Sequence, residues 1–335
     1  MNERINGQLA DLWQQAEEYG VGQGTSLEMG LGELFSRVPE LFGELLTAGL
    51  DTGVKLLAVA LICAMGRGME QTGRTSSLSA VRLAGALAIT ALTMTDVAAM
   101  IGLGRDTIAR MDLFAAVLLP VMAILTALSG SVTAAAVRQG ATVLFSKGLV
   151  AVMDGVLVPM VYAYVVVSCA RAACGAPGLE RLAQGIRSAV TGVLTVLLVV
   201  FVGYLTASGA IAGSVDVSRV KAARMAISRA IPVVGGILAD ASETVLAGAG
   251  ALRGSVGAAG MLVVLAICLT PFLHLGAQYL IYKGTAALCA VAAPAELAGL
   301  IDAIGSAFGL ILGMTGASAL ILLVSVVSAV LSVSG

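Results

Sequence analysis

The sequence predicts an all-α protein: a polytopic membrane helical bundle of seven or eight transmembrane helices with an internal repeat, preceded by an amphipathic N-terminal region. Three observations predict this class: 59% of the 335 residues are hydrophobic, only 12% are charged, and long uncharged apolar runs recur. A soluble domain carries about 25% charged residues, because its surface has to stay hydrated. Crossing about 30 Å of hydrocarbon takes about 20 helical residues.

Residues 1–51 differ from the rest of the chain because acidic side chains outnumber basic ones there. Apolar residues recur at helical spacing on both sides of the Gly-rich stretch 20–32, so we expect two amphipathic helices. Their acidic faces do not suit an anionic lipid surface, so we expect them to dock on a partner or on the membrane domain. Met1 is followed by polar residues, and we expect no signal peptide.

Residues 52–335 form the predicted polytopic membrane domain. Weaker candidate spans, which carry one or two charges, are about 52–69, 80–104 and 148–170. Uncharged runs long enough to span a bilayer are 113–137, 188–215, 254–282 and 303–335. Asp96 lies inside the second weaker span and Asp154 near the start of the third, where solvation is easier.

Proline spacing indicates a duplication. Pro120 and Pro159 are 39 residues apart, as are Pro232 and Pro271, and the two pairs are offset by 112 residues. The predicted copies are 113–215 and 225–327. Three spans per copy would give the copies opposite orientations in the membrane, and inverted repeats place functional sites on helices broken by Pro or Gly.

The candidate helix-breaking or hinge residues are therefore Pro120, Pro159, Pro232, Gly235, Gly236 and Pro271. The alternative is that these prolines merely kink membrane helices, where proline is common.

Asp240 and Glu243 are the candidate functional carboxylates. They lie three residues apart, on one helical face, after a Pro and a Gly pair. If their segment spans the bilayer, each charge is costly unless it is paired or hydrated, which marks a functional site. The alternative is an interfacial or re-entrant helix with both carboxylates in water. The first case corresponds to eight spans and the second to seven, and the positions of basic residues do not decide between them.

Composition and motifs exclude several function classes. A net charge of −1 offers no attraction for nucleic acid. The five cysteines show no CxxC spacing and His274 is the single histidine, so we expect no metal. Phosphate-loop, zinc-protease and nucleophile-elbow motifs are missing from the sequence, so we expect no cofactor and no enzymatic activity.

Several sequence strings resemble the stage III sporulation protein AE family, over roughly residues 50–335. The strongest part is 216–290, with the core IPVVGGILADASETV followed by LTPFL and LIYKGTAAL; an earlier string is LLPVMAILTALSG. Members of that family commonly begin with a cleavable signal sequence, a feature not expected here.

The resemblance implies a multi-pass protein of the mother-cell membrane around the forespore. It implies partners among the other stage III A-operon proteins, a forespore-made channel partner and a YidC/Oxa-type insertase, besides membrane lipid. Together these form a channel or secretion-like complex needed for endospore development. Two functions stay open at this point: a membrane component of that complex, and a small-molecule conduit or transporter built on the inverted repeat.

Overall fold

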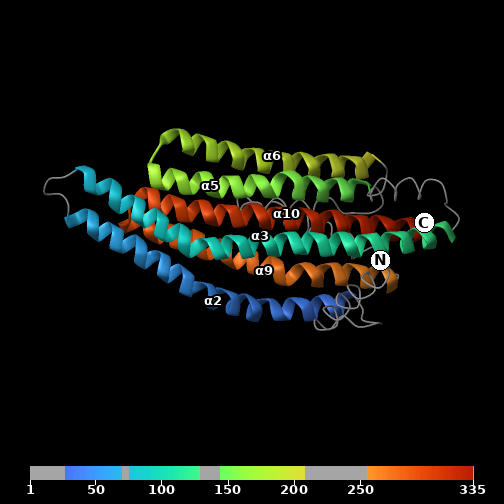
Figure 1. Ribbon diagram of the computed structural model, residues 1–335. Coiled ribbons are helices and arrows are strands. Elements are labelled where there is room, and N and C mark those ends of the chain that lie inside the picture. Colours follow the sequence, from blue (N-terminus) through green and yellow to red (C-terminus); the bar gives the residue numbers. More distant parts are fainter. Residues whose placement is uncertain (1–26, 70–74, 129–143, 208–254, 335) are drawn as a thin grey trace.

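The structure is a computed structural model that describes residues 27–69, 75–128, 144–207 and 255–334. These residues are almost entirely helical, and they form a bundle of roughly parallel and antiparallel rods (Figure 1). The elements are α2 (Leu27–Met69), α3 (Thr75–Leu128), η1 (Met153–Leu157), α5 (Val158–Cys174), α6 (Pro177–Ala207), α9 (Ser255–Ala292) and α10 (Ala295–Ser334). A helical stretch over 144–152 leads into η1, a single π-helical turn.

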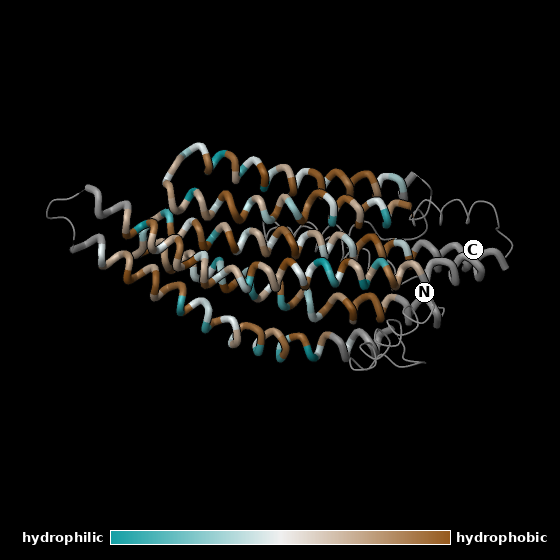
Figure 2. Tube along the Cα trace, viewed as in Figure 1, coloured by the Kyte–Doolittle hydropathy of each residue, from teal (hydrophilic) through white to brown (hydrophobic). Residues whose placement is uncertain are grey.

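Within the described residues, six helical stretches are long and apolar enough to cross a membrane. The predicted all-α membrane class is therefore confirmed. The prediction of seven or eight spans exceeds this number slightly: the spans expected over 80–104 and 113–137 fall on the one helix α3 as far as residue 128, and the segment that the eight-span alternative adds lies in 208–254, outside the described part of the chain. Figure 2 colours each residue by its hydropathy and shows hydrophobic residues along the whole length of the described helices.

Helix α3 differs from the two separate spans expected over 80–104 and 113–137. It runs without a break through the charged stretch 105–112 and has 54 residues, about 80 Å at 1.5 Å per residue. Charges of this stretch have partners in the segment around η1: Arg105 pairs with Asp154 and Asp112 with Lys147. A run of charges between apolar segments therefore does not require a loop here.

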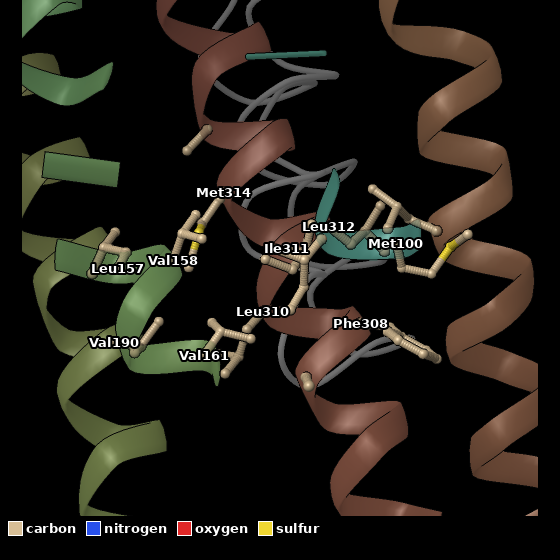
Figure 3. Packing of buried hydrophobic residues seen from close by; sticks show 14 of the residues in the cluster. Met100, Leu157, Val158, Val161, Val190, Phe308, Leu310, Ile311, Leu312 and Met314 are labelled. Carbon is tan, nitrogen blue, oxygen red and sulfur yellow. The ribbon is translucent and has the colours of Figure 1, made fainter. Parts of the chain in front are cut away.

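Helix α10 lies at the centre of the bundle and packs against α9, α3, α5, α6 and α2. In its candidate membrane-spanning stretch 94% of the residues are buried, against 17% in that of α6. Figure 3 shows its side chains Leu310 and Met314 among Val158 and Val161 of α5. The most apolar helix of the bundle is thus the one furthest from its surface.

The α5–α6 and α9–α10 hairpins each turn at an Ala-Pro pair. Helix α6 begins at Pro177, and Pro294 immediately precedes α10, as suits a residue that lacks an N–H and fixes φ for a first helical turn. Helix α5 ends at Gly175, whose φ of 69° is the left-handed cap conformation that glycine adopts without strain. Arg82 of α3 donates a hydrogen bond to the Cys174 carbonyl there, at 3.2 Å.

The predicted boundaries and hinges lie as follows. The division at 51/52 falls inside α2, which continues through it, and residues 1–26 lie outside the described part. Pro120 lies within α3 and Pro271 within α9, and neither helix ends there. Pro159 is the second residue of α5, directly after η1, so the missing N–H coincides with the widened turn. The repeats 113–215 and 225–327 stay a prediction.

Close packing of α3 against α10 depends on Gly104. A Cβ atom at this position would clash with Cγ2 of Ile311, a stiff β-branched side chain. By contrast, a Cβ atom at Gly102, two residues earlier on the same helix, would meet nothing within 4 Å. These two glycines separate the effect of helix contact from that of helix propensity.

We therefore expect Gly104→Ala to destabilise the bundle by about 1–3 kcal/mol, the usual cost of overpacking. Gly102→Ala is the matched control and should be neutral or slightly stabilising, because alanine favours helix over glycine. Thermal unfolding of the purified protein in detergent measures both. Equal shifts for the two variants would contradict the close α3–α10 contact.

Candidate functional site

The residues best suited to a functional role form a polar cluster between α9 and α10. The α9–α10 polar cluster consists of Lys283, Asp302 and Ser306. The Lys283 ammonium group donates to Oδ1 of Asp302 at 2.6 Å and to Oγ of Ser306 at 2.8 Å. Ser306 donates in turn to the Asp302 carbonyl at 3.0 Å. Each member thus has a partner inside the cluster.

Hairpin geometry brings this cluster together. Lys283 lies nine residues before the end of α9 and Asp302 seven residues after the start of α10. The two helices are antiparallel neighbours joined at Ala293 and Pro294, so these positions fall at the same level. Lys283 is the only Lys, Arg, Asp or Glu on α9, and α10 holds only Glu296 besides Asp302. The hairpin thus has few charged residues, and the two that lie inside its apolar stretches, Lys283 and Asp302, form an ion pair.

Pairing is what makes these charges tolerable. Both residues lie in stretches that can span a membrane, where a charged side chain is expensive and generally faces a polar partner or a hydrated cavity. The side chains are 25% exposed for Lys283 and 49% exposed for Asp302. The cluster is therefore open at one side of the bundle while Ser306 is buried in it.

A second polar contact joins α3 to α9 beside the α9–α10 polar cluster. Tyr282, fully buried, donates its hydroxyl proton to Oδ2 of Asp96 at 2.8 Å. Its ring meets that of Phe308 edge to face, with centroids 4.9 Å apart. His274 lies within electrostatic range of Asp96. Because Tyr282 precedes Lys283, adjacent residues of α9 connect it to α3 and to α10.

Two further ion pairs link α3 to the helix that contains η1. Arg105 donates to Asp154 at 2.9 Å, and Lys147 lies 3.8 Å from Asp112. The side chains of Arg105 and Asp154 are each about half exposed, at 50% and 52%. Exposed pairs of this kind contribute little to stability, so we assign them a role in orientation.

The sequence singled out some of these residues and missed others. Asp96 and Asp154 were marked as carboxylates inside or near spans, and both have a cationic or hydroxyl partner. Asp240 and Glu243 lie outside the described residues, as do Pro232, Gly235 and Gly236. Lys283 and Asp302 were not predicted, although one signal was available: they are single charges in apolar runs on either side of a Pro turn.

The arrangement can fix helices relative to one another, but its chemistry is limited. Among the residues that the structure describes, no three His, Cys, Asp or Glu side chains are placed to hold a metal ion. Cys268 is buried and its Sγ lies 3.2 Å from Sδ of Met111. The described contacts are ion pairs and hydrogen bonds that bridge α3, α5, α9 and α10.

Comparison with known proteins identifies relatives. The profile of the stage III sporulation protein AE family matches residues 20–333. A curated relative, the stage III sporulation protein AE of Bacillus subtilis (strain 168), is 26% identical over 251 residues. The match covers 74% of this chain, and the chain spans 62% of the length of that relative. No solved structure gives a significant match.

The Lys283–Asp302 pair generates a double-mutant prediction. Lys283→Gln or Asp302→Asn alone leaves one charge without its partner inside an apolar span, so each should destabilise the protein. The double variant removes both charges and should be less destabilised than the sum of the single variants, by a coupling on the order of 1 kcal/mol. Thermal unfolding in detergent gives the four stabilities, and strict additivity would show that the two side chains do not interact.

Tyr282→Phe tests the contact with α3. It removes the hydroxyl donor to Asp96 and keeps the ring against Phe308, so we expect a loss of about 1–3 kcal/mol, typical of a hydrogen bond to a charged group. The control is Tyr162→Phe on α5, where the side chain is 42% exposed and the change should be near zero. Unfolding in detergent compares the two, and a neutral Tyr282→Phe variant would contradict the assigned bond.

Proposed function

Because the chain belongs to the stage III sporulation protein AE family, we propose that it is an integral membrane component of the channel or secretion-like complex that joins mother cell and forespore. In this proposal it acts as a packed membrane base for its partners and performs no catalytic step. Its location is the mother-cell membrane around the forespore. Its partners are other stage III A-operon proteins, a forespore-made channel partner and, during assembly, a YidC/Oxa-type insertase.

The burial of α10 is the observation that supports a packed base. The axis of the described bundle is filled by a helix whose spanning stretch is 94% buried. A recess beside it, lined by Ile108, Asp112 and Ser318 among others, holds about 10 Å³, which is room for about one water molecule. A bundle packed in this way suits a component that supports other subunits.

Helix α6 offers the surface that we propose for partner contact. Its spanning stretch is only 17% buried, and Val196, Val199 and Val200 are each more than half exposed. In an isolated subunit such a face contacts lipid tails. In a complex it provides an apolar surface on which a neighbouring membrane helix can pack without displacing any helix of this bundle.

The second candidate function is a conduit for small molecules or ions. The observation that favours it is the open side of the α9–α10 polar cluster, where Asp302 is 49% exposed, since charged side chains inside a span often face a water-filled cavity. Asp240 and Glu243 would contribute further carboxylates if they lie in the bilayer. If the protein is a conduit, neutralising these charged residues should stop spore formation even when the complex assembles normally.

Sporulating cells distinguish the two candidates. For the packed base, the double variant Asp240→Asn with Glu243→Gln should leave heat-resistant spore counts near normal. Val196→Trp with Val199→Trp, which enlarges the α6 face, should lower those counts at least tenfold and reduce copurification of the partners. Leu280→Trp, an exposed position on α9 away from α6, is the control.

Immunoblots must show equal protein levels for all variants. Loss of spores in the carboxylate variant, with the protein present and the complex assembled, would overturn the packed base in favour of a conduit. Normal spore counts and normal copurification in the α6 variant would remove the proposed contact surface.

A further inference from the structure

Charged side chains of neighbouring helices lie near one buried tyrosine. Tyr164 of α5 is 5% exposed; it lies within electrostatic range of Arg187 on α6, and Ser306 of α10 is the hydrogen-bond partner of its hydroxyl. Asp302 of α10 and Arg171 of α5 are also within electrostatic range, and Lys283 of α9 joins the group because it binds Asp302 and Ser306.

The charges of this group do not balance. Lys283 is paired with Asp302, while the nearest carboxylate oxygen to Arg171 belongs to Glu180, at 3.9 Å. The guanidinium of Arg187 makes no ion pair or hydrogen bond with any residue in the described part of the chain. Two carboxylates thus face three cations, and the surplus positive charge lies at Arg187.

The group lies near the end of the bundle that holds the turns, at a depth from which its long side chains can reach the membrane interface. The α5–α6 and α9–α10 turns lie at the same end (Figure 1). Arg187 is ten residues beyond Pro177, about 15 Å along α6, and it belongs to a stretch able to span the membrane. A long basic side chain at such a depth extends toward the interface, where lipid phosphates lie.

Glycine on α10 makes room for the second arginine. A Cβ atom at Gly299 would lie 2.8 Å from Nη2 of Arg171, so the guanidinium lies directly over the helix backbone, one turn before Asp302. Apolar side chains border the same end: Leu182 of α6 is 51% exposed and Leu288 of α9 is 62% exposed. The group therefore combines cations with a surface on which acyl chains can lie.

We propose that Arg171, Arg187 and Lys283 bind the phosphate headgroup of an anionic membrane phospholipid. Basic groups between transmembrane helices are the usual means of recognising such headgroups, because guanidinium forks match phosphate oxygens. The lipid is the anion available at this depth, and its phosphate supplies the partner that Arg187 lacks within the described chain.

The test uses the full-length protein, purified in detergent and stripped of lipid. Added phosphatidylglycerol should raise its thermal unfolding temperature and remain bound in native mass spectra, whereas phosphatidylcholine should do neither. Arg187→Gln should lower retained phosphatidylglycerol at least fivefold. Arg181→Gln, which removes an exposed charge near the start of the same helix, is the matched control and should retain lipid as the unchanged protein does.

Several outcomes decide the proposal. Retention of phosphatidylglycerol by Arg187→Gln at the unchanged level would overturn it, as would equal binding of phosphatidylcholine. Stabilisation by inorganic phosphate alone, without retained lipid, would show a site for a free anion and would also overturn it. If Arg187→Gln fails to fold, Arg171→Gln, which removes the guanidinium that lies over Gly299, should still lower retained phosphatidylglycerol, and unchanged retention by that variant would overturn the proposal.

Discussion

The burial of one helix, α10, is the constraint on which the rest of the structure depends. Helix α10 carries no charged residue after Asp302, so its remaining length requires apolar surroundings, and in this bundle side chains of neighbouring helices provide them. Five other helices provide that cover, and they approach closely because glycine stands at contact points such as Gly104. In a membrane, where lipid tails are as apolar as leucine, such close packing takes the place of the hydrophobic effect between helices.

Polar contacts then fix the helices that packing brings together. Dispersion contacts between apolar helices oppose only weakly the sliding or rotation of one helix against the other. An ion pair or hydrogen bond forms in only one relative position of the two helices. Lys283–Asp302 and Tyr282–Asp96 set α9 against α10 and α3, and Arg105–Asp154 sets α3 against the π-helical turn. A small number of charged residues inside apolar stretches therefore determines the register of these long helices.

These features together favour a structural role in an assembly over a passage within one subunit. The centre of the described bundle is solid, and its polar groups are largely engaged with each other. What remains available is at its periphery: the apolar face of α6, and the surplus positive charge of Arg187 near the turns. Both are surfaces for other molecules, a neighbouring helix in one case and an anionic headgroup in the other. The proposed role in a membrane complex therefore agrees with a subunit that presents its binding groups outward.

The sequence by itself determined the class of the fold, the approximate positions of most apolar helices and the family, because hydropathy, proline turns and family-specific strings are local properties of the chain. It could not show that α3 continues through 105–112, since the partners that Arg105 and Asp112 have there, Asp154 and Lys147, lie in another segment of the chain. Nor could it pair Lys283 with Asp302, because which charges meet depends on which helices lie side by side. Tertiary structure decided those questions: in an apolar surrounding the energy of a charge depends on its nearest partner, and only packing determines which partner that is.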